Sequence, residues 1–331
     1  MPFIKSIRKQ FDKPEKGPKV TDFLDITGGD IVYTAGGWKI HMFTSAGESS
    51  LDVRLKPEFS DNPEVLALTA GNLQAEYVVV AGGGSGGPLI AGGGGAGGYL
   101  AGNISLGRGS TPLTVGAGGA SPALNTWPQT TPGNQGGPSA FGPSIAVTGG
   151  GFGGGCYQNG GPGGSGGGGG HHVGGGGGGA GGPGTNATGP AGSQGAGAGT
   201  PGQGFGGGTA QISAAPVYPG NAGPGGPGIS SSITGTAVTR AGGGGGGRLG
   251  GPSYAPGGAA GSGGPGGGGA GGLDPSPWGG TPALSGQPAP NVGGDNTGSG
   301  GGGGGYNPGG SPQTSSGGAG SPGIVIVRYL T

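Results

Sequence analysis

The sequence is poor in charge, in apolar side chains and in cysteine. Charged residues make up 8% of the 331 positions and apolar residues 29%, against about 25% and about 45–50% in ordinary globular proteins. So few apolar side chains exclude a close-packed core that spans the whole chain, and with it an ordinary globular enzyme. The single cysteine, Cys156, cannot form an intramolecular disulfide, so the chain is not a disulfide scaffold.

Long apolar runs and net charge are also lacking. The longest apolar runs, near Val78–Ala81 and Ile324–Val327, are far shorter than the about 20 residues of a membrane-spanning helix, so membrane insertion is not expected. The net charge is zero, which removes the electrostatic basis for binding nucleic acid. The first residues, Met1–Lys5, do not begin an apolar signal peptide, so we expect synthesis in a cytoplasm.

What the sequence has in abundance is glycine, and its distribution divides the chain. Of the 105 glycines only seven precede residue 81, and there are 31 prolines. Charge runs the other way, because residues 1–80 hold 20 of the 26 charged side chains and no lysine follows Lys56. These opposite gradients predict a boundary near Ala81–Gly82.

The first 25 residues are predicted to form an N-terminal arm. Four apolar residues fall near helical spacing between basic residues, and Pro14 and Pro18 end any helix there. Two interpretations stay open: a frayed basic terminus, or a docking peptide that orders against a partner. The candidate docking residues are Phe3, Ile4, Ile7 and Phe11.

Residues 26–81 are predicted to form a small antiparallel β-module. Asp30–Thr34, a glycine turn and Trp38–Thr44 have the pattern of a hairpin with one buried face, on which Trp38, Ile40 and Met42 lie opposite Lys39 and His41. Leu51–Leu55 alternates in the same way, and Glu76–Ala81 has the pattern of a strand buried on both faces. Residues 56–74 are predicted to be an irregular insertion with a helical turn around Glu64–Leu68.

Residues 82–331 are predicted to form a glycine-rich body. Collagen is excluded because glycine is not found at every third position. Disorder is disfavoured by the near absence of charge and by strand-like segments that end in a closing strand at 323–330. The remaining structure is a bundle, or sandwich, of polyglycine type II helices that pair through backbone groups. The fold class is therefore mainly β with little helix, with strands near 77–81 and 324–329 expected to pair.

Aromatic residues stand between the glycine islands and are candidates for surface recognition. On loop tips they would suit the stacking contacts of carbohydrate or protein binding. Equally, they could cap the ends of the bundle and cover its backbone. The candidates are Trp127, Tyr157, Tyr218, Tyr254, Trp278 and Tyr306.

The apparent catalytic and cofactor-binding motifs of the sequence are incomplete. The G-x-G-x-x-G after Val78–Ala81 lacks both a following amphipathic helix and a ribose-binding carboxylate, since no acidic residue occurs between Glu76 and Asp274. The two G-x-S-x-G matches lack an α/β context. His171 and His172 have no nearby partners for zinc. We therefore expect no enzyme, no cofactor and no metal.

The order of strand and glycine segments resembles the glycine-rich domain of tailed-bacteriophage tail fibres and other virion structural proteins. It is also similar in style to the tip adhesins of T-even-type long tail fibres, in which polyglycine type II rods carry variable receptor-binding loops. The resemblance covers about residues 26–331. It rests on Ile26–Gly29, Gly36–Gly47, Ala75–Gly84, Gly92–Tyr99, Leu113–Gly119, Ser231–Thr239 and Gly323–Tyr329.

This resemblance implies a virion component that presents loops to a host surface. Its partners would be other virion proteins, through the arm, and a host-surface glycan or outer-membrane protein, and it could form a homotrimer. One alternative is a capsid or tail decoration fibre without receptor binding. Further alternatives are an ice-binding protein or an extracellular filament protein built on polyglycine helices.

Overall fold

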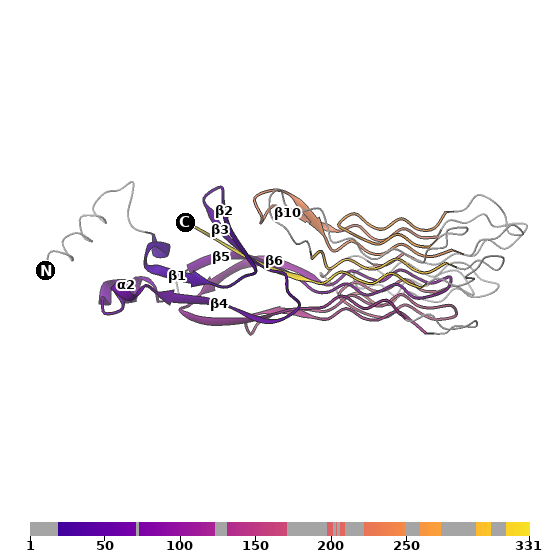
Figure 1. Ribbon diagram of the computed structural model, residues 1–331, viewed down its shortest axis with the longest axis horizontal. Helices are drawn as coiled ribbons and strands as arrows, with labels where there is room; N and C mark the ends of the chain where they lie inside the picture. Colours follow the sequence, from indigo (N-terminus) through magenta and orange to yellow (C-terminus); the bar gives the residue numbers. More distant parts are fainter. Residues whose placement is uncertain are drawn as a thin grey trace, which may run out of the picture.

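The computed structural model describes residues 19–70, 73–122, 131–170, 197–200, 203, 206–208, 222–248, 259–272, 296–305 and 316–331. The protein is mainly β and its strand pairs are antiparallel, as predicted (Figure 1). The strands are β1 (Leu24–Thr27), β2 (Ile31–Ala35), β3 (Trp38–Phe43), β4 (Gly47–Leu55), β5 (Leu73–Val80), β6 (Tyr99–Leu106), β7 (Gly109–Val115), β8 (Ser139–Phe141), β9 (Ile145–Val147), β10 (Ile229–Ser231), β11 (Val238–Arg240) and β12 (Ile324–Leu330). The helical elements are η1 (Val20–Phe23), η2 (Pro57–Phe59) and α2 (Pro63–Leu68).

Two five-stranded sheets pack face to face, in the orders β1-β4-β7-β8-β9 and β2-β3-β12-β5-β6. Alternation along each strand places one set of apolar side chains between the sheets. This core includes Phe43 from β3, Leu51 from β4, Phe141 from β8 and Val325 from β12, all fully buried. Strands from both sides of the glycine boundary therefore share one core.

The outer face of the second sheet is covered too. Ile40, Met42, Ile324 and Ile326 lie on this face in a second apolar cluster, together with Ile233 from the turn between β10 and β11. Both faces of β12 are removed from water, because Val325 and Val327 pack in the core between the sheets while Ile324 and Ile326 pack in this second cluster. The predicted double burial of Glu76–Ala81 is confirmed from Val78 onward, where the side chains are at most 1% exposed.

The predicted pairing of the closing strand with 77–81 is confirmed. β12 runs antiparallel to β5, with Ile324 opposite Val80 and Arg328 opposite Glu76. The hairpin of β2 and β3 is confirmed as well, with Ile31 opposite Met42.

The expected exposure of one face of that hairpin is wrong at His41. Its side chain is 1% exposed, because the face that carries His41 lies towards the first sheet. The ring Nδ1 lies 2.6 Å from the carbonyl oxygen of Gly28, and Nε2 lies 3.0 Å from the hydroxyl of Tyr329. A carbonyl can only accept, so Nδ1 carries the proton and Nε2 accepts from Tyr329. Burial lowers the pKa of His41, which keeps this neutral form in the core.

The helical turn predicted around Glu64–Leu68 in the insertion after β4 is confirmed, since α2 spans Pro63–Leu68. The Asn62 side chain caps α2 by accepting from the backbone N–H groups of Glu64 and Val65. Proline at the start of α2 fits the first turn, where its missing N–H has no partner to lose. The expected irregular stretch ends earlier than predicted, because β5 begins at Leu73.

Beyond the sheets, the described glycine-rich segments run side by side in extended form, and we call them rods (Figure 1). Each strand from β5 to β12 continues directly into a rod or follows directly from one. The rods are residues 81–87, 91–98, 116–122, 131–138, 148–155, 160–170, 197–200, 206–208, 222–228, 241–248, 259–264, 268–272, 296–305 and 316–323.

Backbone hydrogen bonds join the rods in a three-residue rotation. Successive N–H groups of rod 81–87 donate in turn to rods 131–138, 316–323 and 91–98, at 2.9–3.1 Å. The donor–acceptor pairs are Gly82–Gly137, Gly83–Ser321, Gly84–Gly95, Ser85–Asn134, Gly86–Gly318 and Gly87–Gly92. Three other rods donate to its carbonyl groups, through Gly119, Gly150, Gly153, Gly301 and Gly304. One rod thus has six hydrogen-bonded neighbours.

The rods are too close together for side chains on the shared faces. A Cβ atom added to Gly84 would lie 2.2 Å from the carbonyl oxygen of Gly151, and one added to Gly86 would lie 2.0 Å from that of Gly302. The core of the bundle is therefore backbone, and it satisfies its own N–H and C=O groups. We interpret the threefold rotation as that of polyglycine type II helices, which have three residues per turn.

Candidate functional site

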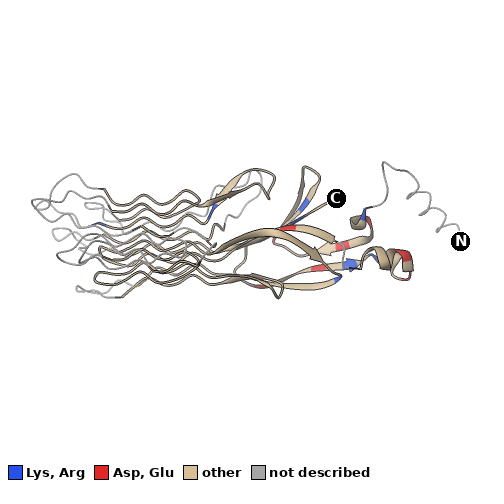
Figure 2. Cartoon of the chain, turned by 180° about the vertical axis from the view of Figure 1, so that it is seen from behind, with Lys and Arg blue, Asp and Glu red and all other residues tan. Residues whose placement is uncertain are grey.

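The two ends of the molecule differ in chemistry. Figure 2 shows charged residues on the β-sandwich and its helical elements, whereas the described rods are almost free of them. Among the described rods the only charged residue is Arg248. The described chain begins at Lys19 on the charged side, and the Lys19 ammonium group there contacts the carbonyl oxygen of Thr331, the last residue.

The rods extend away from the sheets to an opposite end, which we call the far end (Figure 1). The hydrogen-bond register places the Pro88–Ile90 turn there, since Gly87 and Ala91 both pair with Gly304. Leu89 and Ile90 have positive φ values of 57° and 35°, and their side chains are 0% and 2% exposed. The rods that run from the sheet end towards this end include 116–122, 241–248, 268–272 and 296–305 (Figure 1).

Of the predicted recognition residues, the structure describes Tyr157. It follows the buried Cys156 in the turn between rods 148–155 and 160–170, and it is half-buried with φ of 68°. This turn lies at the far end, where the Gly170 N–H donates to the carbonyl oxygen of Gln158. Trp127, Tyr218, Tyr254, Trp278 and Tyr306 lie outside the described residues, as do the candidate docking residues Phe3, Ile4, Ile7 and Phe11.

Reactive and metal-binding groups are scarce in the part of the chain that the structure describes. No group of three or more His, Cys, Asp or Glu side chains there could hold a metal ion, and His171 and His172 lie outside it. No described helix is long and apolar enough to span a membrane. Burial raises the pKa of the Cys156 thiol to about 11, which disfavours the nucleophilic thiolate.

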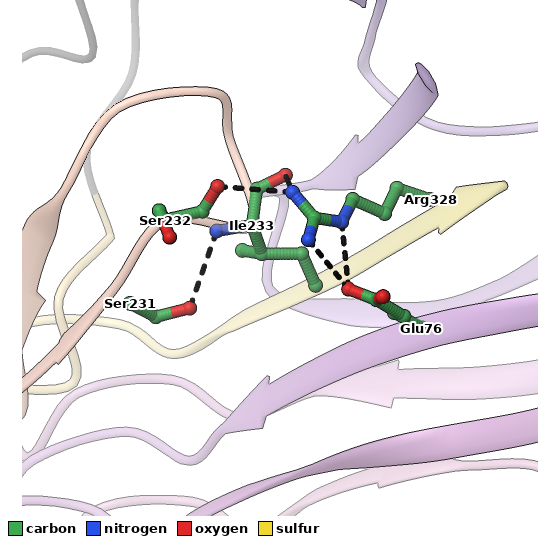
Figure 3. Close-up of polar contacts among 5 residues, drawn as sticks. All are labelled: Glu76, Ser231, Ser232, Ile233 and Arg328. Carbon is green, nitrogen blue, oxygen red and sulfur yellow. Dashed lines mark hydrogen bonds and ion pairs between the residues drawn. The ribbon is translucent and has the colours of Figure 1, made fainter. Parts of the chain in front are cut away.

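A groove of about 310 Å³ lies between the β10–β11 turn and the outer face of β5 and β6. Arg328 closes one side of it (Figure 3). The guanidinium Nε and Nη2 lie 2.8 and 2.6 Å from Glu76 Oε2, and Nη1 donates to the carbonyl oxygens of Ser232 and Ile233 at 3.0 and 3.2 Å. The guanidinium also lies 4.4 Å from the ring centre of Trp38. Arg328 therefore ties the turn to two strands of the sheet.

Sequence reasoning did not single out this groove, although a signal was present. Glu76 and Arg328 each carry a charge within a strand that is otherwise almost wholly apolar. The predicted antiparallel pairing of those strands brings the two residues opposite each other. The sequence gives no such signal for Ser231 and Ser232. These two residues are far along the chain from Glu76 and Arg328, and only the folded protein brings them to the same groove.

A family described as "Glycine-rich domain" matches residues 64–330, which is most of the chain. The chain belongs to the glycine-rich domain family. None of the curated proteins matches it.

The glycine-rich domain contains both the rods, with their far end, and the strands that carry the Arg328 groove. It begins within α2 and ends at Leu330, the last residue of β12, so it takes in every rod and both strands that hold Glu76 and Arg328. Strands β1–β4 precede it, yet they complete the two sheets that the glycine-rich domain enters. The domain and the residues before it thus form one packed unit.

Proposed function

We propose that this protein is a bacteriophage virion structural protein, a tail fibre or adhesin that presents loops for recognition of a host surface. One observation carries the proposal: a charged β-sandwich forms one end of the molecule, and a bundle of almost uncharged rods extends away from it to the other end. Such polarity suits a part that attaches at one end and meets its target at the other. The family match supports the glycine-rich architecture on which this role depends.

The bundle is suited to presenting variable segments. Lateral contacts between rods are made by backbone groups, so the rods need no particular side chains from the segments that join them. Those joining segments can change in sequence while the register of rods such as 81–87 is kept. Recognition residues on loops held by a rigid scaffold are a common arrangement.

In this proposal the two ends have different partners. Phe3, Ile4, Ile7 and Phe11 dock the arm onto other virion proteins, and the protein forms a homotrimer at the virion surface. Trp127, Tyr157 and Trp278 belong to the segments that meet a host-surface glycan or outer-membrane protein. Flat aromatic faces suit both kinds of target, since they stack on sugar rings and on protein side chains.

The test is immunogold electron microscopy of virions produced from the source genome, with an antibody against residues 1–18. Label at the tail tip or on fibres supports the proposal. Label spread over the capsid would instead indicate a decoration fibre without receptor binding. Absence from virions would overturn the proposal and favour an ice-binding or filament protein.

Adsorption assays then separate recognition from assembly. Trp127→Ala and Trp278→Ala should reduce adsorption about 10-fold or more, as expected where an aromatic side chain is a main binding contact. Val32→Ala is the matched control, because Val32 is an exposed apolar residue of β2 in the sandwich, 43% exposed. Full adsorption by both tryptophan variants would contradict their assigned role.

A further inference from the structure

We infer that the groove beside Arg328 is a binding site for a neutral sugar unit. The inference does not depend on the proposed role of the far end, because the groove lies on the β-sandwich. Its volume of about 310 Å³ falls at the lower limit of small-molecule pockets. Its described walls combine one ion pair, an amide, hydroxyl groups and the Ala101 methyl group.

The ion pair gives the groove a fixed wall without a free charge. Four hydrogen bonds or ion contacts and one ring contact hold the Arg328 guanidinium, whose side chain is 18% exposed. A side chain held in this way is already ordered before a ligand arrives, which lowers the entropic cost of binding. The neighbouring Glu76 carboxylate balances the positive charge, so the wall is close to neutral.

Three polar groups on the groove have capacity to bind. Among the described residues none forms a hydrogen bond with Glu76 Oε1, with the Asn103 side-chain amide or with the Ser232 hydroxyl (Figure 3 shows Glu76 bonded through its other oxygen). Both Asn103 and Ser232 are exposed, and the Glu76 side chain is 37% exposed. Together they offer acceptors and donors within one groove.

This combination favours a polyhydroxylated ligand over other classes. A sugar hydroxyl can donate to the Glu76 carboxylate and accept from the Asn103 amide or the Ser232 hydroxyl. An anion would meet the Glu76 carboxylate, while the Arg328 N–H groups are directed to existing partners. A divalent cation would find a single carboxylate, which is too few ligands. A mainly apolar ligand would leave the polar rim unpaired.

The test is saturation-transfer NMR on the full-length protein with glucose, galactose, mannose, rhamnose and N-acetylglucosamine, each offered separately. Two variants change the groove. Asn103→Ala deletes the side-chain amide, and Ala101→Leu places a larger side chain in the groove. Both variants should keep the fold, because both residues are exposed positions of β6. Ser105→Ala is the matched control on the same strand and face, outside the groove lining.

We expect at least one sugar to receive saturation from the wild-type protein and from Ser105→Ala. Asn103→Ala should weaken its affinity about 5-fold or more, the effect of one lost net hydrogen bond, and Ala101→Leu should abolish binding. No transfer to any of the five sugars would overturn the inference. Transfer that survives in both groove variants would also overturn it, by placing the sugar elsewhere, and would leave the proposed role of the far end untouched.

Discussion

Replacing Gly86 with alanine should break the bundle at a defined contact. The new Cβ would lie 2.0 Å from the carbonyl oxygen of Gly302 and 2.4 Å from its carbonyl carbon, whereas real Cβ atoms essentially never approach within 3.0 Å. All three nearest atoms are backbone, so no side chain can turn aside. Rods 81–87 and 296–305 must therefore separate by about 1 Å, the difference between these distances.

The energetic cost follows from the hydrogen bonds across that contact. Gly301 donates to Gly84 at 2.9 Å and Gly304 donates to Gly87 at 2.8 Å, and both bonds would lengthen past the usual limit. Each lost bond costs about 1 kcal/mol net, and up to about 3 kcal/mol if its groups stay buried without partners. The variant should therefore lose about 2–6 kcal/mol, a large part of the about 5–15 kcal/mol by which proteins are stable.

Denaturant unfolding followed by circular dichroism measures this loss. Gly107→Ala is the control, because a Cβ there has nothing within 4 Å and Gly107 is exposed between β6 and β7. The control should be unchanged or stabilised by up to about 1 kcal/mol, since alanine reduces the freedom of the unfolded chain. Equal stability of the two variants would refute a core built from closely packed backbone.

Three further predictions concern side chains. Arg328→Met should speed amide hydrogen exchange about 10-fold in 229–240, by loss of about 1.4 kcal/mol of local stability, and leave β4 of the other sheet unaffected. Unchanged exchange in 229–240 would contradict the role of Arg328 in holding the β10–β11 turn. Because burial lowers the pKa of His41 below 6.5, its contribution to stability is present above about pH 6.5 and is lost as the pH falls. His41→Gln should therefore flatten the loss of unfolding free energy between pH 7 and 5; an unchanged slope would contradict this. Cys156, with its pKa raised to about 11, should resist iodoacetamide at pH 8 until urea unfolds the protein, and rapid native labelling would contradict its burial.

The β-sandwich was largely predictable because its strands carry side chains that distinguish them. The hairpin of β2 and β3, and the pairing of β12 with β5, follow from alternation and from apolar runs. The burial of His41 was not predictable in this way. A hairpin pattern shows which residues share a face, but it does not show that a second sheet will cover the other face.

The lateral order of the rods could not be predicted from the sequence. Glycine segments such as Gly92–Gly98 and Gly242–Gly247 are chemically alike, so their side chains do not specify which rod lies beside which. The Ser85 and Ser299 hydroxyls do accept hydrogen bonds from neighbouring rods, but the sequence does not show from which. Much of that order comes from the strands to which the rods are attached, and strand order is a property of the whole fold. The Arg328 groove was missed for the same reason, since the Ser231–Ile233 wall comes from a distant part of the chain.

The continuity of strands and rods has a mechanical consequence. A pull on the far end would pass along the covalent backbone, from rods such as 81–87 and 316–323 directly into β5 and β12. The hydrogen bonds between rods lie across the direction of that pull, because they join rods that run side by side. Many bonds would then have to shear together before one rod could slide, so the molecule should be stiff in tension while its far end stays free to vary.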